Sequence, residues 1–296
     1  MGTRMTVAAT PLHPLFAAEL AGIDMRRPLE GATLDAVVAA MDRYAVCVVR
    51  NERPLSDAEH IAFSRALGPM QRTGALKVEG RDRARIPHPE IIDQSNLDAD
   101  GYVFREGDRQ LLFKRANRLW HTDLSFHPVR ATYSLLAAHD LPPGGGPDTE
   151  FADLRAAYDA LPAAMKARIE PMVAWHSYWH SRVLGGGPEA TAEEAASRPP
   201  AAHRLVQTHP GSGRKTLYLA SHAFRIDGMD DDEARALLRE LSEFATERRF
   251  VYAHKWRLGD VVIWDNRCTM HRAMPFDDLI ERRDVRRTTC REAAVA

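Results

Sequence analysis

Short apolar strands that do not alternate regularly with helices are the feature that most constrains the fold of this chain. The segment 131–153 predicts a strand, a turn rich in proline and glycine, and a second strand. Short β-branched or apolar runs predict further strands at 45–50, 249–256, 259–266 and 285–292. Strict alternation of strand and helix is missing, and no GxGxxG motif follows a strand. The pattern therefore argues against a doubly wound dinucleotide-binding fold.

Apolar residues at helical spacing predict helices at 34–44, 56–68, 153–169 and 230–247. The second of these begins with Ser56 and Glu59, spaced as in a capping box, and the third is interrupted at Pro162. Between the two groups of strands, a segment of about 165–215 shows no regular pattern. We interpret this segment as a loop-rich, irregular insertion.

Charge and cysteine content argue against several classes of protein. The 296 residues carry 40 Lys and Arg against 41 Asp and Glu, a formal charge of −1, so nothing favours a nucleic-acid or membrane partner. Cys47, Cys268 and Cys290 are too few and too scattered for a disulfide framework or a Cys-rich zinc site. The first residues lack the apolar core of a signal peptide, and no apolar run of membrane-spanning length occurs. We therefore expect a cytoplasmic protein.

The segment 118–128, RLWHTDLSFHP, contains His121 and Asp123, separated by one residue. In a strand or at a strand end, alternate side chains lie on one face, so both could bind the same ion. The pair alone is weak evidence in a chain with 13 histidines, and a third ligand must come from elsewhere. His271 is the best candidate, because it follows the buried run 261–264 after a short polar loop. Two histidines and one carboxylate suit non-haem Fe(II) in oxygenases, and such donors also suit Zn(II).

Arginines one strand beyond His271 provide a candidate anchor for a cosubstrate. An iron site of this kind needs an electron donor, and a 2-oxo acid such as 2-oxoglutarate chelates the metal through its 2-oxo group and adjacent carboxylate. Its distal carboxylate then needs a bidentate arginine. In RRDVRR (282–287), Arg283 and Arg287 are four residues apart, hence on one face of a strand. The alternative interpretation is a solvated basic edge strand that blocks aggregation.

Other polar and aromatic residues near these motifs are interpreted as structural. We expect the loop that aims His271 to be fixed by Trp264, Asp265 and Asn266. Cys268 is an unsuitable ligand beside an iron–oxygen site, because its thiolate would be oxidised easily. The aromatic cluster in the central segment, residues 175–180, is interpreted as lid or interface packing.

Together these motifs resemble one protein family. WHTDLSF, Thr149 in GGGPDTEF, WDNRCTMHRA and RRDVRR are similar to the Fe(II)/2-oxoglutarate-dependent taurine dioxygenase and 2,4-dichlorophenoxyacetate dioxygenase family. The resemblance spans nearly the whole chain and is strongest to the 2,4-dichlorophenoxyacetate (aryloxyalkanoate) dioxygenase branch. It implies a mainly β fold with α insertions and a double-stranded β-helix (jelly roll) core. Residues 1–296 would form a single dioxygenase domain, with the irregular insertion of about 165–215 inside the jelly roll.

The resemblance also implies roles for individual residues. The residues that match the family's iron ligands are His121, Asp123 and His271. Thr149 matches a threonine that contacts the carboxylate of 2-oxoglutarate, and Arg283 matches the arginine that clamps it, with Arg282 as an open alternative. The implied cofactors are Fe(II), 2-oxoglutarate as cosubstrate and O2, with ascorbate as an activator.

The candidate substrate contacts come from the same resemblance. Arg287 matches an arginine that faces the substrate anion, and His209 and His222 match histidines proposed to line the substrate pocket. Lys77 is a candidate partner for a substrate carboxylate, and Asn96 is a further pocket candidate. The alternative interpretation is that the lysine is solvated and that the two histidines are ordinary, partly buried side chains.

The implied reaction is hydroxylation of an aryloxyalkanoate such as 2,4-dichlorophenoxyacetate next to the ether oxygen. Its products are a phenol, glyoxylate, succinate and CO2. One alternative is the same chemistry on taurine, on another alkyl sulfonate or sulfate, or on a natural aryl carboxylate. A second is a metal-free or zinc-loaded jelly roll that only binds a small acid. The expected partner is a small anionic molecule, and the family implies a homo-oligomer.

Overall fold

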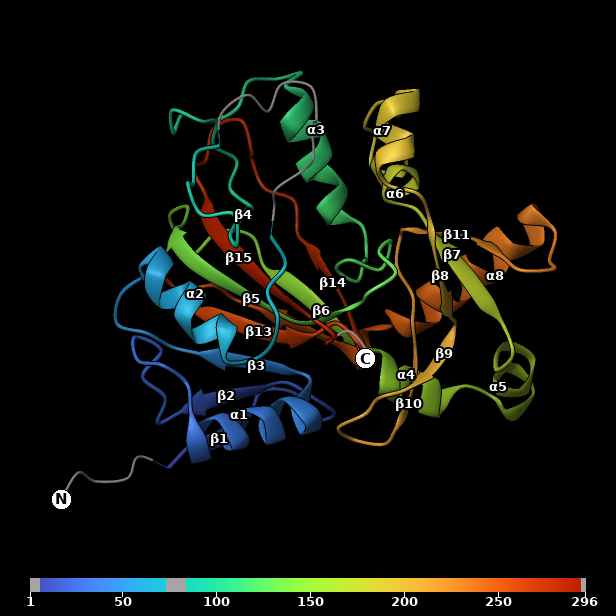
Figure 1. The fold of residues 1–296 in the computed structure, drawn as a ribbon, viewed down its shortest axis with the longest axis horizontal. Coiled ribbons are helices and arrows are strands. Elements are labelled where there is room, and N and C mark those ends of the chain that lie inside the picture. The colour runs from blue at the N-terminus through green and yellow to red at the C-terminus, as the bar shows by residue number, and fades with distance from the viewer. Residues whose placement is uncertain (1–5, 73–83, 294–296) are drawn as a thin grey trace.

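Two β-sheets packed face to face form the centre of the structure, a computed structural model that describes residues 6–72 and 84–293 (Figure 1). Within these residues, the larger sheet has seven strands in the order β1-β2-β3-β13-β5-β15-β4. Neighbouring strands are antiparallel except β2 and β3, which are parallel. The strands are β1 Ala8–Pro11, β2 Ala18–Ala21, β3 Val46–Val49, β4 Ile92–Asp93, β5 Ala131–Asp140, β13 Val261–Asp265 and β15 Asp284–Arg291.

The smaller sheet, in the order β12-β6-β14, covers the inner face of the larger one. Its strands are β6 Thr149–Asp153, β12 Val251–His254 and β14 Thr269–Ala273. Successive strand residues face opposite sides, so alternate side chains of the larger sheet point inward. Val262 pairs with Val48 and Leu136, and all three belong to one buried cluster with Phe151 of β6. This is the arrangement of a double-stranded β-helix.

The outer face of the larger sheet is covered by two helices, α1 Gly31–Tyr44 and α2 Asp57–Arg65 (Figure 1). Leu135 and Ile263 point to this side and form a buried cluster with residues of both helices. The predicted helix start is confirmed, because Ser56 Oγ accepts the Glu59 N–H while the Glu59 carboxylate accepts the Ser56 N–H. Polar capping thus defines where α2 begins, and apolar burial defines the face it presents.

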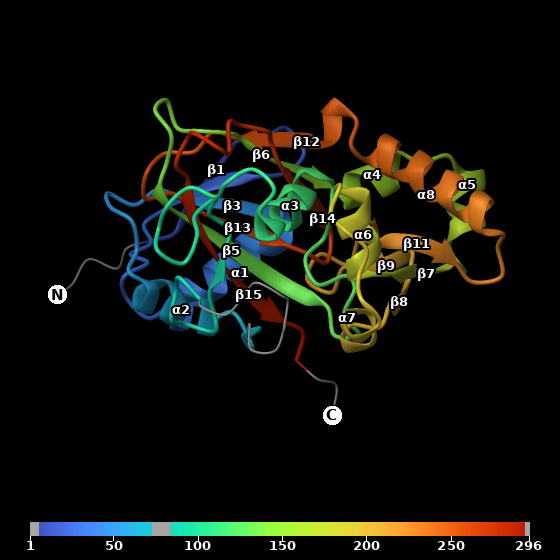
Figure 2. The ribbon, with the colours of Figure 1, turned by 90° about the horizontal axis from the view of Figure 1, so that it is seen from above.

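A second core lies beside the jelly roll, under α8 Asp231–Ala245 (Figures 1 and 2). As predicted, Pro162 divides the helical segment 153–169 into two helices, α4 Leu154–Ala160 and α5 Ala163–Ile169. Met270 of β14 belongs to this second core, whereas the next residue, His271, points to the opposite side of its strand. β14 therefore packs Met270 into the second core and presents His271 on its opposite face.

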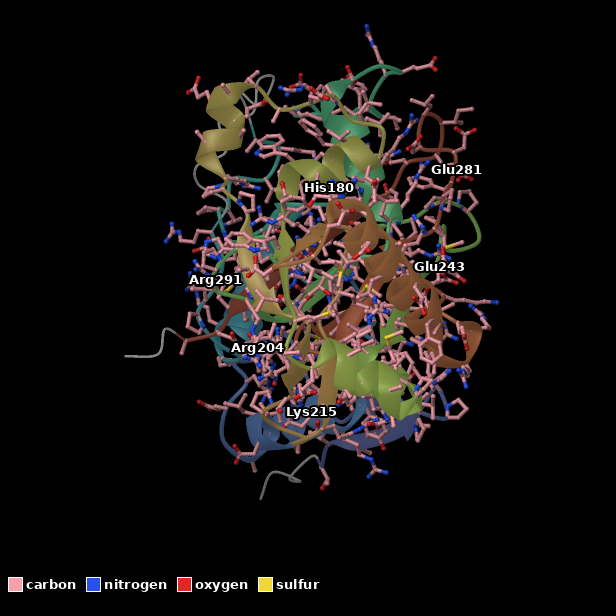
Figure 3. All side chains as sticks on the ribbon, turned by 90° about the vertical axis from the view of Figure 1, so that its right-hand side faces the viewer. His180, Arg204, Lys215, Glu243, Glu281 and Arg291 are labelled. Atoms are coloured by element: carbon pink, nitrogen blue, oxygen red, sulfur yellow. The ribbon has the colours of Figure 1, made fainter. Side chains whose placement is uncertain are left out.

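The prediction of an irregular segment over about 165–215 is wrong. The segment contains β7 Val173–His176, α6 Tyr178–Leu184, α7 Ala192–Ser197, β8 Ala201–Arg204, β9 Val206–Thr208 and β10 Lys215–Leu217. With β11 Ala223–Ile226, β7 and β8 form a three-stranded sheet. Figure 3 shows this side of the molecule, where Arg204 and Lys215 carry exposed charges on β8 and β10. These elements are so short that neither helical nor strand periodicity emerges from the sequence.

A short helical stretch leads into the site: α3 Arg109–Arg115 continues as a 3-10 helix, η1 Ala116–Arg118. A second 3-10 helix, η2 Arg248–Phe250, precedes β12. No helix among the described residues is long and apolar enough to cross a membrane.

Candidate active site

His121, Asp123 and His271 converge at the edge of the smaller sheet. His121 follows η1 and exchanges two backbone hydrogen bonds with His271 of β14, at N···O distances of 3.0 and 2.8 Å. A turn after His121 then brings Asp123 close to the imidazoles of His121 and His271. The Nε2 atoms of both histidines lie 3.9 Å from Asp123 Oδ1. Three donor atoms thus face one point, although only a single bridge, and not an extended strand, holds His121 in place.

Hydrogen bonds fix the orientation of His121 and Asp123. His121 Nδ1 lies 2.8 Å from the Leu119 carbonyl, to which it donates, so Nε2 keeps its lone pair free. Ser134 Oγ donates to Asp123 Oδ2 at 2.7 Å, and the Asp123 N–H donates to Asn266 Oδ1 at 3.1 Å. Oδ1 of Asp123 therefore faces the two histidines. Ser134 comes from β5, 11 residues after Asp123, and Asn266 comes from the turn after β13, 143 residues after it.

Burial sets the protonation of the three groups. It lowers the pKa of His121 to about 4, and burial with neighbouring His121 lowers that of His271 well below its ordinary value. Burial alone would raise the pKa of Asp123, yet the positive charge of Arg287, aided by the neighbouring histidine rings and the Ser134 hydrogen bond, outweighs it and lowers that pKa. The set at neutral pH is two neutral imidazoles and one carboxylate, the forms that bind a metal ion.

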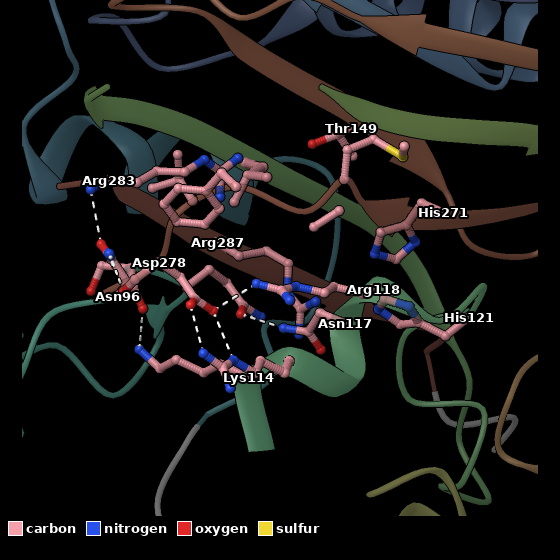
Figure 4. A pocket seen from close by; sticks show the side chains of 18 of the residues that line it. Asn96, Lys114, Asn117, Arg118, His121, Thr149, His271, Asp278, Arg283 and Arg287 are labelled. Carbon is pink, nitrogen blue, oxygen red and sulfur yellow. Dashed lines mark hydrogen bonds and ion pairs between the residues drawn. The ribbon is translucent and has the colours of Figure 1, made fainter. Parts of the chain in front are cut away.

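His121 and His271 line a pocket of about 740 Å³, part of it open to solvent (Figure 4). Thr149, Arg283 and Arg287 line the same pocket. Among the described residues, no hydrogen-bond partner exists for Arg283 Nε or Nη2, although the side chain is buried. Burial lowers the pKa of Arg283 to about 10, which still leaves the guanidinium charged at neutral pH. A buried cation with unused donors that faces a pocket is a ready site for a carboxylate.

The side of the pocket nearest α3 carries a closed ion-pair network (Figure 4). The Asp278 carboxylate accepts hydrogen bonds from Arg115 at 2.7 and 3.0 Å and from Arg118 at 2.6 Å. These contacts tie α3 and η1 to the loop between β14 and β15. Two arginines and one aspartate leave a net positive charge beside the pocket, which favours an anionic ligand.

Comparison with known proteins agrees with this site. Residues 8–289 match the family model described as "Taurine catabolism dioxygenase TauD, TfdA family". The chain belongs to this family. It is 44% identical over 291 residues to the alpha-ketoglutarate-dependent 2,4-dichlorophenoxyacetate dioxygenase of Cupriavidus pinatubonensis, with coverage of 98% of this chain and 100% of that protein. Identity to the enzyme of the same name from a Burkholderia species is 41% over 285 residues, with 96% and 94% coverage.

A solved structure extends the likeness to three dimensions. The crystal structure of AAD-2 in complex with Mn(II) and N-oxalylglycine matches this fold with a TM-score of 0.92 and 42% sequence identity. The match covers 98% of this chain and 99% of that one. The predicted family, its jelly-roll fold and the dioxygenase class are therefore confirmed.

The structure places Arg283 in the pocket and its neighbour Arg282 at the surface. Half of the Arg282 side chain is exposed, and it bonds Asp140 and the Gly101 carbonyl. Asn96, a predicted pocket residue, lines the pocket, but its side chain is already hydrogen-bonded to other parts of the protein. It accepts the Arg283 N–H and donates to two backbone carbonyls of the loop that precedes Arg283. The geometry thus favours Arg283 over Arg282 as a carboxylate anchor.

The predicted substrate contacts fall in different places. Arg287 lines the pocket and donates a hydrogen bond to Asp123 Oδ1. His209 does not line it; the ring is buried and its Nε2 lies 2.9 Å from Asp265. His222 is also absent from the lining, but its ring lies edge-on to His121, with centroids 6.1 Å apart. Lys77 lies outside the described residues.

The structure agrees with the predicted role of the WDN sequence. Asp265 holds the loop before β14, because its carboxylate accepts the Arg267 N–H and its carbonyl accepts the Cys268 N–H and the Thr269 hydroxyl. Trp264 packs against His271, with ring centroids 4.6 Å apart. The prediction did not include that Asn266 accepts the Asp123 N–H. The sequence reasoning also missed Ser134, which bonds Asp123, because an isolated serine within an apolar strand carries no signal of that contact.

Proposed function

We propose that this protein is an Fe(II)- and 2-oxoglutarate-dependent dioxygenase that hydroxylates an aryloxyalkanoate next to its ether oxygen. The observation that carries the proposal is the buried Arg283 side chain in the same pocket as His121 and His271, whose Nε and Nη2 find no partner within residues 6–72 and 84–293. A metal site alone fits many functions. A metal site that shares a pocket with an anchor for a distant carboxylate fits a cosubstrate with two acidic ends.

The donor set fits a divalent iron ion. His121, Asp123 and His271 would hold it on one side and leave the pocket side open. Bound iron and 2-oxoglutarate together would supply the O2-dependent oxidation of a C–H bond, with succinate and CO2 as the products of the cosubstrate. Ser134 and Asn266 would keep the Asp123 carboxylate aimed at the ion.

The cosubstrate tail would be bound by Arg283 and Thr149. The guanidinium offers Nε and Nη2 for a bidentate contact, and the Thr149 hydroxyl lies in the same pocket. Burial strengthens this contact, because water competes poorly there. In the part of the chain that the structure describes, Arg287 Nε also lacks a partner, and Arg287 lines the same pocket, where it would be available to a substrate anion.

The substrate class rests on charge and on the relatives. Asp278 is the one carboxylate among the described lining residues, against five cationic side chains: Lys114, Arg115, Arg118, Arg283 and Arg287. This balance favours an anion. The two relatives above are named for action on 2,4-dichlorophenoxyacetate. Hydroxylation beside the ether oxygen of such a substrate gives a hemiacetal, which divides into a phenol and glyoxylate. Assembly as a homo-oligomer, a cytoplasmic location and a role of ascorbate remain predictions.

The test measures succinate and phenol from protein supplied with Fe(II), 2-oxoglutarate, ascorbate and O2, with 2,4-dichlorophenoxyacetate as substrate. We expect both products in equal amounts. Arg283→Ala should raise the KM for 2-oxoglutarate by about ten- to a hundredfold through loss of a charged hydrogen-bond pair. Arg282→Ala, the matched control, should leave that KM unchanged.

Each failure has a separate meaning. Succinate without phenol from any aryloxyalkanoate would reject the substrate class and keep the dioxygenase. Release of sulfite or sulfate from an alkyl sulfonate or sulfate would then support the alternative branch. No succinate from protein that holds iron would reject the proposed reaction altogether.

A further inference from the structure

Trp256 stands directly behind the proposed site for the 2-oxoglutarate tail. It lies in the turn between β12 and β13, only 3% exposed, in the core between the two sheets. Its indole N–H donates a hydrogen bond to Thr149 Oγ1, with an Nε1···Oγ1 distance of 3.0 Å. The Arg283 guanidinium carbon lies 6.0 Å from the centre of the same ring. One indole therefore contacts both side chains that we assign to the distal carboxylate.

The hydrogen bond from Trp256 decides what the Thr149 hydroxyl can do. A hydroxyl has one O–H to donate and two lone pairs to accept. Because the indole N–H can only donate, it occupies a lone pair of Oγ1 and leaves the O–H for another acceptor. Thr149 lines the pocket, so an acceptor bound there would receive that proton in a hydrogen bond.

The surroundings of Trp256 hold its ring in place. The His254 ring packs edge-on against it, with centroids 4.6 Å apart at an angle of 90°. His254 itself is fixed between the Tyr252 hydroxyl at 3.2 Å and Asp260 at 3.1 Å. At the backbone of Trp256, a Cβ atom at Gly145 would lie 2.6 Å from the carbonyl oxygen. The glycine turn thus permits close packing behind the tryptophan.

We infer that Trp256 is a positioning residue that orients the Thr149 hydroxyl toward the distal carboxylate and so helps select 2-oxoglutarate over 2-oxo acids that lack this carboxylate. The inference rests on the proposed function, because it assumes that 2-oxoglutarate binds in this pocket. Trp256 acts through Thr149 and through its packing against Arg283. Its effect should appear in cosubstrate affinity and not in the affinity for the substrate.

Calorimetric titration of Mn(II)-loaded protein tests this without turnover. Trp256→Phe keeps a ring beside Arg283 but removes the N–H. We expect the Kd for 2-oxoglutarate to rise roughly three- to tenfold, the loss of one hydrogen bond. The Kd for 2-oxobutyrate, which has no distal carboxylate, should not change. In a Thr149→Val background, Trp256→Phe should add less than about twofold, because the hydroxyl that it orients is already missing.

The control is Trp175→Phe, which removes another indole hydrogen bond, from Trp175 Nε1 to Asp227 at 2.6 Å, outside the pocket lining. It should leave both Kd values unchanged. Equal losses for 2-oxoglutarate and 2-oxobutyrate, or fully additive effects in the Thr149→Val background, would overturn the inference. If Trp256→Phe does not fold, Thr149→Val alone still decides: wild-type affinity for 2-oxoglutarate would mean that no hydroxyl needs positioning. Wild-type protein that binds no 2-oxoglutarate would instead refute the proposed function.

Discussion

Two buried clusters in the described part of the chain each bring a histidine, a carboxylate and a third potential ligand within 4.8 Å of one another. The first cluster is His121, Asp123 and His271, and the second is His209, Asp265 and Cys268. By distance and burial alone they are alike. Their hydrogen bonds separate them.

In the second cluster the donor atoms are already used. His209 Nδ1 accepts the Ser212 N–H, and its Nε2 donates to Asp265. Both carboxylate oxygens of Asp265 accept hydrogen bonds from Arg267, at distances down to 2.6 Å. Burial raises the pKa of Cys268 well above its ordinary value, so the sulfur stays protonated at neutral pH. This cluster is a closed structural network.

In the first cluster both histidine Nε2 atoms keep free lone pairs within the described residues, and the one central atom that the protein engages is Asp123 Oδ1, which accepts a hydrogen bond from Arg287. The other contacts are on the outside: His121 Nδ1 donates to the Leu119 carbonyl, and Ser134 donates to Asp123 Oδ2, so both Nε2 atoms lie 3.9 Å from Oδ1. The cluster also opens to a pocket, through its two histidines. The comparison teaches that free lone pairs and access, more than proximity, distinguish a candidate metal site.

The largest effect should come from removing the carboxylate of the first cluster. Asp123→Ala should abolish stoichiometric metal binding and reduce succinate formation by more than the roughly 10- to 100-fold typical of losing an outer partner of a metal ligand. Metal content and succinate measure the two effects. If this variant still bound one equivalent of metal, the first cluster would not be the metal site, and the contrast between the two clusters would be wrong.

Removal of the carboxylate of the second cluster should affect stability and not metal. Asp265→Asn leaves the partly buried Arg267 and the buried His209 without their anion, which should lower the free energy of unfolding by about 3–5 kcal/mol. Urea denaturation measures this loss, with metal content of the folded protein as the control. A metal-depleted variant of unchanged stability would assign the second cluster a metal-binding role.

A buried histidine outside both clusters sharpens the contrast, because no carboxylate of the described residues pairs with it. His176 is fully buried, with His203 and Tyr218 as its ring neighbours, and burial lowers its pKa from 6.5 to about 3. Below pH 6.5 the unfolded chain binds a proton that the folded protein excludes. As the pH is lowered from 7 to 5, this group therefore lowers the free energy of unfolding by about 2 kcal/mol.

His176→Leu should remove that contribution. Between pH 7 and pH 5, the variant should lose about 2 kcal/mol less stability than the wild type, measured by denaturant titration at each pH. An identical pH dependence in the two proteins would show that His176 does not titrate on unfolding.

The smallest effect should come from the sulfur of the second cluster. Cys268→Ala removes one buried atom that donates a weak, 3.9 Å hydrogen bond to the Asp265 carbonyl. Stability should change by about 1 kcal/mol or less. Titration with Zn(II), which thiolates bind well, should give the same stoichiometry as in the wild type. A lost equivalent of Zn(II) would contradict the structural interpretation of this cluster.

The sequence by itself determined features that depend on neighbours along the chain. The capping box at Ser56, the break at Pro162 and most strands follow from local patterns, so they were predicted correctly. The spacing of His121 and Asp123 and the position of His271 after a buried strand also indicated the triad. Residue types and short spacings carry that information, since they set which atoms are available.

Only the tertiary structure decided how those atoms are used. His209 and Asp265 are 56 residues apart and hydrogen-bond to each other, which leaves neither free for a metal ion. Asn266, 143 residues from Asp123, accepts the Asp123 N–H and so orients it. Arg282 and Arg283 are adjacent in sequence, yet one lies at the surface and the other is buried in the pocket. Such outcomes depend on which strands pair and which faces pack, and these long-range contacts leave no local pattern in the sequence.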